Sequence, residues 1–191
     1  MQDIHIVIMG VAGCGKSEIG QRLAALLDVP LIEGDTFHSP LSVAKMRDGV
    51  PLTDADREGW LSVLGEQLSH HAGAVMTCSA LRRTYRDALR GSLNLALNPT
   101  SPRTLVPLNF LFLHIDEATA QARVAARADH FYPASLVASQ FATLEDPSGE
   151  PRVLTMDATL PPDEIATRTV AWLQRSKNTQ TATPIGEFHE K

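Results

Sequence analysis

The chain has 191 residues, of which 43% are hydrophobic, and this length suits one α/β core but not two large domains. The formal net charge of −5 disfavours nucleic acid and anionic membrane surfaces as partners, because both carry negative charge themselves. Two cysteines make no disulfide framework, and no apolar run approaches the about 18 residues that a membrane helix needs. We therefore expect a cytoplasmic protein with no nucleic-acid or membrane partner.

The first predicted elements are a buried strand over residues 4–9 and a loop that contains Gly10, Gly13 and Gly15. Glycines permit positive φ and leave no Cβ between the backbone and a ligand. A helix is predicted next, since apolar residues recur on one face at Ile19, Leu23, Leu26 and Leu27. Strand, glycine-rich loop and helix follow one another in the order that phosphate binding requires.

Residues 10–17 have the full P-loop spacing, in which a glycine and four further residues precede Gly15-Lys16-Ser17. The backbone N–H groups of such a loop and the positive end of the following helix bind a polyphosphate. We expect Lys16 to reach the β- and γ-phosphates and Ser17 to hold Mg²⁺. The predicted nucleotide-binding residues are Gly10, Gly13, Cys14, Gly15, Lys16 and Ser17.

A second strand over residues 30–32 runs toward Asp35, and helix signals follow. Ser39 is the expected N-cap of a helix that has Pro40 at its first position and Gly49 beyond its end. Thr53 and Asp56 form a capping-box pattern at the start of another helix. Residues 39–70 are therefore predicted to be helical.

The rest of the chain alternates strands with helices. Strands are predicted at residues 73–80, 108–115 and 152–156, helices at 81–90, 117–128, 133–144 and about 165–173, a polar loop at 91–107 and a polar, flexible tail at 176–191. This alternation predicts an α/β domain over residues 1–175, with a parallel five-stranded sheet and helices on both faces.

Ligands of such sheets bind beyond the carboxyl ends of the strands, so Asp35 and Ser79 should lie close to the P-loop. Asp35 is placed to contact a substrate hydroxyl or a Mg²⁺-bound water. Four arginines over residues 82–90 suit a small anionic substrate, because a guanidinium can bind a carboxylate in a bidentate way. Arg123 and Arg127 could neutralise the charge that develops on a transferred phosphoryl group.

A regulatory GTPase is disfavoured. Its Asp-x-x-Gly motif occurs at residues 56–59 but inside a predicted capped helix, and an Asn-Lys-x-Asp motif is absent from the sequence.

Four stretches, taken together, resemble the gluconate kinase family of P-loop small-molecule kinases. They are "MGVAGCGKS", "EGDTFHSPLSVAKMRDGVPLTDADREGWL", "TCSALRRTYRDALR" and "RVAARADHFYPASLVASQFATLEDP", spread over residues 9–147. "KMRDGVPLTDADR" and "CSALRRTYRD" are distinctive among P-loop kinases, so the resemblance is more specific than the P-loop alone.

The resemblance implies an adenylate-kinase-like fold with substrate-binding helices and a mobile lid at about residues 123–147. It also implies ATP and Mg²⁺ as cofactors, transfer of the γ-phosphoryl group to the 6-hydroxyl of D-gluconate, and a homodimer. Asp35 would be the base or hydroxyl orienter, and Arg123 and Arg127 would be the lid arginines. The residues implied on the sugar-acid side are His38, Lys45, Arg57, Ser79, Arg83, Arg86, His130 and Gln140.

The chain departs from the family pattern near the expected substrate pocket. There His38-Ser39-Pro40 replaces a usual His-Pro pair, and Asp129 takes the place of a glycine. Apart from this set, Glu33 stands where an aspartate is common. A kinase for another small hydroxy acid, such as a shikimate-like acid, therefore stays open as an alternative. A non-catalytic nucleotide-binding regulator is a second alternative, against which Asp35 and the arginines argue.

Overall fold

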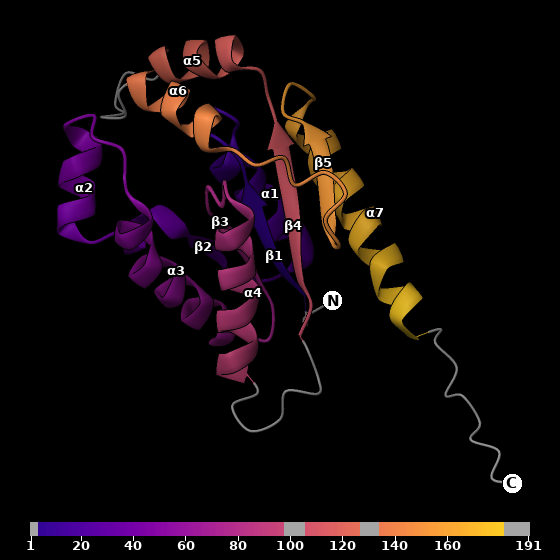
Figure 1. The fold of residues 1–191 in the computed structure, drawn as a ribbon. Coiled ribbons are helices and arrows are strands. Elements are labelled where there is room, and N and C mark those ends of the chain that lie inside the picture. Colours follow the sequence, from indigo (N-terminus) through magenta and orange to yellow (C-terminus); the bar gives the residue numbers. More distant parts are fainter. Residues whose placement is uncertain (1–3, 98–105, 127–133, 182–191) are drawn as a thin grey trace, which may run out of the picture.

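The computed structural model of the chain describes residues 4–97, 106–126 and 134–181. These residues contain one five-stranded sheet in the order β2-β3-β1-β4-β5, with every neighbouring pair parallel (Figure 1). The strands are β1 (His5–Met9), β2 (Leu31–Glu33), β3 (Ala74–Thr77), β4 (Leu108–His114) and β5 (Val153–Asp157). The predicted parallel α/β sheet is confirmed.

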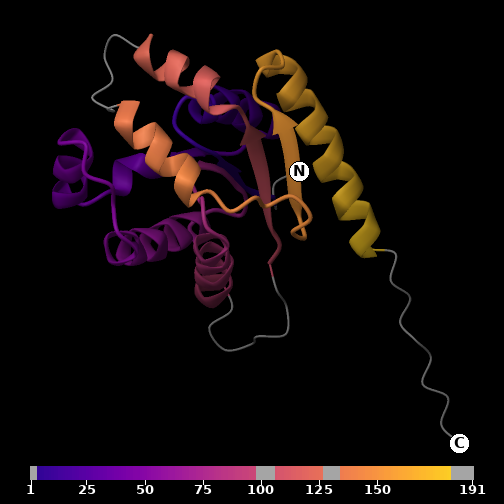
Figure 2. The same cartoon turned by 45° about the horizontal axis from the view of Figure 1, so that its top comes forward.

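Helices cover both faces of this sheet, as Figures 1 and 2 show. They are α1 (Lys16–Leu27), α2 (Pro40–Arg47), α3 (Asp54–Ser69), α4 (Arg83–Leu97), α5 (Glu117–Ala125), α6 (Ala134–Thr143) and α7 (Pro162–Thr181), with a 3-10 helix η1 (Gly34–Phe37). Helices α1 and α7 pack together on one face, and α3 and α4 on the other. Among the described residues, no helix is long and apolar enough to cross a membrane.

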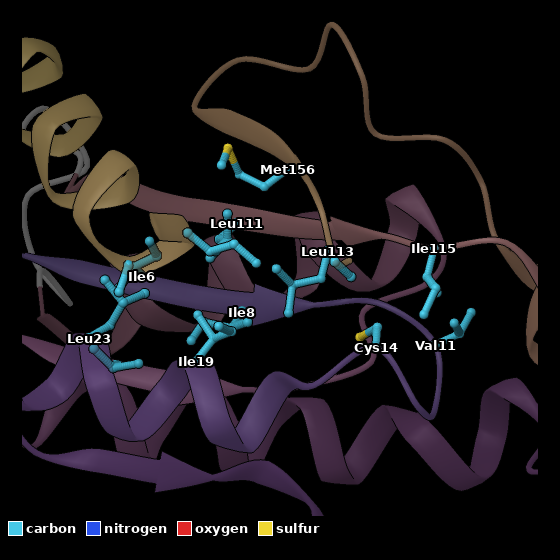
Figure 3. Packing of buried hydrophobic residues seen from close by; sticks show 14 of the residues in the cluster. Ile6, Ile8, Val11, Cys14, Ile19, Leu23, Leu111, Leu113, Ile115 and Met156 are labelled. Atoms are coloured by element: carbon cyan, nitrogen blue, oxygen red, sulfur yellow. The ribbon is translucent and has the colours of Figure 1, made fainter. Parts of the chain in front are cut away.

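The central strand β1 contributes side chains to both layers of the core. Ile6 and Ile8 belong to the cluster under α1 and α7, part of which Figure 3 shows, whereas Val7 and Met9 belong to the cluster under α3 and α4. All five residues of β1 are buried. A strand that is covered on both faces is mostly apolar, which explains the run from Ile6 to Met9. The buried polar residue, His5, has its Nε2 within hydrogen-bond distance of the Leu68 and His71 carbonyl oxygens.

Two predicted helix starts are confirmed by their cap contacts. The Ser39 hydroxyl accepts a hydrogen bond from the backbone N–H of Ser42, and Thr53 and Asp56 form the complete capping box. The helical region over residues 39–70 is nevertheless interrupted at residues 48–53. Gly49, with φ of 73°, ends α2 in the left-handed region, and the chain then turns before Thr53 caps α3.

Two other boundaries also differ from the prediction. Helix α4 continues through residues 91–97 of the expected loop, where Leu93 is buried against the core; residues 98–105 lie outside the described part. Helix α7 continues to Thr181, so the first residues of the expected tail are helical. In α4, burial of Leu93 extends the helix beyond the point where the polar sequence suggested an end.

The strands end at the edge where the candidate site lies. Figure 1 shows α5, α6 and α2 at the end of the sheet toward which the β4 arrow points. The P-loop follows the central strand at this edge, and η1 follows β2 at the same edge. Segments that are distant in the sequence therefore surround one region.

Candidate active site

The glycine-rich loop between β1 and α1 has the backbone shape that the sequence predicted. Gly10, Gly13 and Gly15 have φ of 141°, 85° and 95°, values that side chains disfavour. A Cβ at Gly13 would lie 2.6 Å from the Ala120 carbonyl oxygen, so the loop also requires glycine there for space. Gly15 is the N-cap of α1 and provides no side-chain cap, which leaves the positive end of the helix available to a ligand.

Lys16 and Cys14 have contrasting environments in this loop. The Lys16 ammonium donates to the carbonyl oxygens of Gly10 and Val11, both at 3.1 Å, and lies at the wall of a cavity. The Cys14 side chain is buried in the core, and this burial raises the pKa of its thiol. Only the backbone of Cys14 is therefore suited to a phosphate contact.

A carboxylate from β2 lies next to the start of α1. The Ser17 hydroxyl donates to Glu33 Oε2 at 3.1 Å, and the Thr77 hydroxyl from the end of β3 donates to the same oxygen at 2.5 Å. The end of β2, the end of β3 and the start of α1 thus meet at the Glu33 carboxylate. In the sequence, Glu33 stands out only as a departure from a family pattern, and no local pattern predicts these contacts.

Asp35 and His38 lie beside each other on and just after η1. The Asp35 side chain is 76% exposed, whereas the His38 side chain is 5% exposed and its Nε2 lies 3.9 Å from Asp35 Oδ1, too far for a hydrogen bond. The His38 ring stacks on Trp60 of α3 with ring centroids 4.1 Å apart. Burial lowers the pKa of His38, Asp35 opposes this effect and Arg57 adds to it, so the ring is neutral at pH 7.

Two guanidinium groups lie at the wall formed by the start of α3 and the residues before α4. Arg57 donates to backbone carbonyls just before α3, and Arg82 pairs with Asp54 at 2.7 Å. The two groups lie 5.5 and 5.9 Å from the centre of the Tyr85 ring. Burial raises the pKa of Tyr85, and its hydroxyl donates to Asp54. The wall therefore carries the positive charges of Arg57 and Arg82, which the Asp54 carboxylate neutralises in part.

Most of the candidate residues that the sequence singled out line one cavity of about 360 Å³. The P-loop provides one side of it, η1 and α3 another, and α6 a third. Gln140 of α6 also accepts a hydrogen bond of 2.6 Å from the backbone N–H of Ala12, which joins α6 to the loop. The candidates that line the cavity are Gly13, Gly15, Lys16, Ser17, Asp35, His38, Arg57, Ser79 and Gln140.

Three of the described candidates for the sugar-acid side do not line this cavity. Lys45 pairs with Asp56 at 2.6 Å, and this ammonium holds the pKa of the Asp56 carboxyl well below its usual range. Arg83 is 68% exposed and lies 3.7 Å from Asp87 on its own helix. Arg86 is fully buried.

The environment of Arg86 corrects the expectation that it faces a substrate. Its guanidinium pairs with Glu150 and donates to the carbonyl oxygens of Ala80, Leu81 and Glu145 at 2.9, 3.1 and 3.3 Å. These contacts join the chain after α6 to the loop after β3. Arg86 is thus a structural cation, which periodicity on a helix cannot distinguish from a ligand-binding one.

Arg123 lies on the other side of the P-loop. Its guanidinium donates to the Ala158 carbonyl oxygen at 3.1 Å and lines a second cavity of about 440 Å³, together with Cys14, Gly15 and residues 159–162 after β5. Arg127 and His130, the other candidates of this region, lie outside the described residues, as does part of the expected lid.

Sequence reasoning missed several residues that line the first cavity, among them Asp54, Trp60 and Arg82. Trp60 has no signal of its own in the sequence, because a tryptophan within a helix is usually a core residue, yet its ring also reaches the cavity. Arg82 belongs to the arginine cluster that the sequence identified, although Arg83 and Arg86 were favoured over it. Their positions depend on how α3 and α4 pack, and no local pattern encodes that packing.

Comparison with known proteins places this arrangement among small-molecule kinases. A gluconokinase from Gluconobacter oxydans is 42% identical over 166 residues, which cover 84% of this chain and 85% of that protein. The crystal structure of a gluconokinase from Sinorhizobium meliloti 1021 superposes with a TM-score of 0.82 at 40% identity, covering 95% of this chain and 98% of that one.

A shikimate kinase from Aquifex aeolicus shares the fold alone, with a TM-score of 0.54 at 14% identity over 91% of this chain and 98% of its own. No family model matches the chain.

Proposed function

The chain belongs to the gluconokinase family, and we propose that it transfers the γ-phosphoryl group of ATP to the 6-hydroxyl of D-gluconate, forming 6-phospho-D-gluconate. The observation that carries this proposal is the cavity that joins the P-loop to Asp35, His38 and Arg57. A nucleotide-binding regulator needs no such second set of groups. We further propose a cytoplasmic homodimer, which is the usual state implied by the family resemblance.

The loop fits a polyphosphate on its own geometry. Gly15 places no Cβ between its backbone and a ligand, and nothing lies within 4 Å of the position that such a Cβ would take. The Lys16 ammonium is close enough to the loop to move onto phosphate oxygens without a change in the backbone. We assign phosphate binding to Lys16 and to the backbone of residues 10–17.

Ser17 and Glu33 are the residues that would hold Mg²⁺. Oxygen ligands suit this ion, and the two side chains already lie in contact at the start of α1. Among the described residues, no group of three or more acidic, histidine or cysteine side chains is arranged to hold a metal ion, so the other ligands of Mg²⁺ would be phosphate oxygens and water. The ion would neutralise part of the negative charge on the phosphates.

The opposite side of the cavity would bind the sugar acid. We call Asp35, His38, Arg57, Trp60 and Arg82 the acceptor wall. Arg57 and Arg82 provide the positive charge that a carboxylate requires, and Asp35 orients the acceptor hydroxyl and accepts its proton. Ser79 and Gln140 add neutral polar groups for the remaining hydroxyls.

Closure of the cavity would complete the site. We propose that residues 123–147 act as a lid and that Arg123 and Arg127 neutralise the charge that develops on the phosphoryl group. Arg123 already lies beside Cys14 and Gly15 of the loop, which supports its role on the nucleotide side. We propose His130 as a further substrate ligand.

The test is the Asp35→Asn variant, which keeps the size of the side chain but removes its charge and its ability to accept the proton. We expect kcat for 6-phosphogluconate formation to fall by about a hundredfold, at the low end of the range for general-base catalysis, while ATP affinity measured by calorimetry stays unchanged. Asp48→Asn is the matched control, since Asp48 is exposed at the end of α2 and should leave both quantities unchanged.

A loss of less than about threefold would be too small for a catalytic base and would remove Asp35 from the mechanism. A panel of sugar acids and other hydroxy acids, shikimate included, tests the substrate. If another acid is phosphorylated and gluconate is not, the protein is a kinase with a different substrate. If no acid is phosphorylated, the result favours a nucleotide-binding regulator.

A further inference from the structure

Trp60 makes two different contacts with the segment that carries Asp35 and His38. Its indole N–H donates to the Gly34 carbonyl oxygen at 2.8 Å, and its ring face stacks on the His38 imidazole with an angle of 17° between the planes. The side chain is buried but still lines the cavity. Trp60 therefore contacts both the backbone of Gly34, which precedes Asp35, and the side chain of His38, which follows it.

The backbone at Gly34 is held from two directions. A Cβ on this residue would lie 2.3 Å from the Thr77 carbonyl oxygen, so the chain is in close contact with the end of β3. The Trp60 N–H binds the Gly34 carbonyl from the other direction. Because both neighbours restrain Gly34, the direction in which Asp35 leaves the backbone is restrained as well.

The His38 ring depends on the stack for its orientation. Its Nδ1 is buried and has no hydrogen-bond partner within the part of the chain that the structure describes, and its Nε2 lies 3.9 Å from Asp35. A ring that is oriented by its face leaves Nε2, at its edge, without a short hydrogen bond to Asp35. This atom can then bind a hydroxyl group of a polyol in the cavity.

We infer that Trp60 is a positioning residue of the acceptor site, which sets Asp35 through the Gly34 carbonyl and His38 through the ring stack. This inference rests on the proposed function, because Asp35 and His38 act there on the sugar acid. The nucleotide side should not depend on Trp60, since Lys16 and Ser17 are held by the P-loop, Glu33 and α1. A displaced acceptor hydroxyl slows transfer steeply, since about 1 Å of misplacement can cost a hundredfold.

The Trp60→Phe variant keeps an aromatic face for His38 and removes the N–H that binds Gly34. We expect kcat with gluconate to fall about tenfold or more, while the KM for ATP changes by less than about twofold, a change too small to indicate a lost contact. Trp172→Phe is the matched control, because Trp172 is the second of two tryptophans and packs against the core under α7. Unchanged kinetics in Trp60→Phe would overturn the inference.

A double-mutant cycle separates positioning from general stability. In the Asp35→Asn background there is no catalytic carboxylate left to orient, so Trp60→Phe should cost less than about threefold there, well below its cost in the wild type. Equal costs in both backgrounds would mean that Trp60 only supports the fold. Thermal melts of all four proteins confirm that each is folded at the assay temperature.

The contact with His38 has a readout that does not need turnover. In the Trp172→Phe protein, Trp60 is the remaining tryptophan, and a protonated imidazole stacked on it quenches its fluorescence. Burial and the nearby Arg57 favour neutral His38 and Asp35 favours the charged form, so we expect quenching with a midpoint below the ordinary pKa of 6.5.

His38→Gln in the same background should remove this transition. A titration that persists in that variant, or none in its parent, would overturn the contact. If instead wild-type protein fails to phosphorylate gluconate while the fluorescence behaves as expected, the proposed function fails and the contact between Trp60 and His38 stands.

Discussion

The P-loop forms its side of the cavity within one short stretch, residues 10–17, whereas the acceptor wall combines η1, α3 and the residue before α4. In the loop, glycine conformations and the start of α1 determine the shape locally. In the acceptor wall, contacts such as the one between Trp60 and Gly34 join residues far apart in the sequence. A change in the loop should therefore disable nucleotide chemistry alone, while the acceptor wall should respond to changes well outside the cavity.

The largest expected effect comes from Lys16→Ala, which tests whether the two sides are independent. Within the described residues, the hydrogen bonds of Lys16 go to loop carbonyls, so its loss should leave the fold intact. We expect phosphoryl transfer to fall at least about a thousandfold, since a cation on the transferred group is lost. Gluconate affinity, measured by calorimetry, should stay unchanged; a parallel fall in that affinity would show that the two sides are coupled.

Arg86→Met tests how much the fold depends on a contact that lies outside the cavity, next to the loop that carries Ser79. Glu150 would keep a nearly buried charge without its principal partner, and the carbonyls of Ala80 and Leu81 would lose their donor beside Ser79. We expect the free energy of unfolding in urea to fall by about 3–5 kcal/mol. Arg83→Met, at an exposed position of the same helix, should change it by less than about 0.5 kcal/mol. Equal effects at the two positions would contradict the assigned role of Arg86.

Acid should reduce the difference between wild type and Arg86→Met. The Arg86 guanidinium holds the pKa of Glu150 below its usual value by hydrogen bonding, and Arg90 adds to this. A depressed carboxyl pKa stabilises the fold above the unfolded value of about 4.3, and this stabilisation is lost as the pH falls through the folded value. Unfolding free energies of the two proteins should therefore converge below pH about 4.3. A constant gap would exclude the ion pair as the cause.

The smallest effect on the free energy of unfolding is expected at Gly59. This helix glycine provides a comparison with Gly13 of the loop. Gly59 lies exposed in the interior of α3, and a Cβ there would meet nothing within 4 Å. Gly59→Ala should raise the free energy of unfolding by about 0.5–1 kcal/mol. Gly13→Ala should lower it, because φ is 85° and the new Cβ would meet the Ala120 carbonyl. Stabilisation by both substitutions would contradict the close packing of the loop.

Local patterns were sufficient for the elements whose chemistry lies within a few residues. The P-loop spacing, the Ser39 cap and the Thr53–Asp56 capping box all correspond to the structure, because each is stabilised by neighbours in the sequence. The strands were recognised from their apolar runs, since a parallel sheet buries both faces. Helix ends were less accurate, as α4 and α7 show, and in α4 the packing of Leu93 on the core extended the helix.

By itself, the sequence determined the P-loop, the alternation of strands and helices, and the edge of the sheet where ligands bind, since backbone conformation and hydrophobic periodicity are encoded locally. Only the tertiary structure decided which charged side chains face the cavity. Arg82 lines it and Arg86 is buried against Glu150, although both belong to one arginine cluster at the start of α4. The physical reason is that a guanidinium is buried only where a carboxylate and free carbonyls surround it, and those groups came from the distant chain after α6 and from the loop after β3.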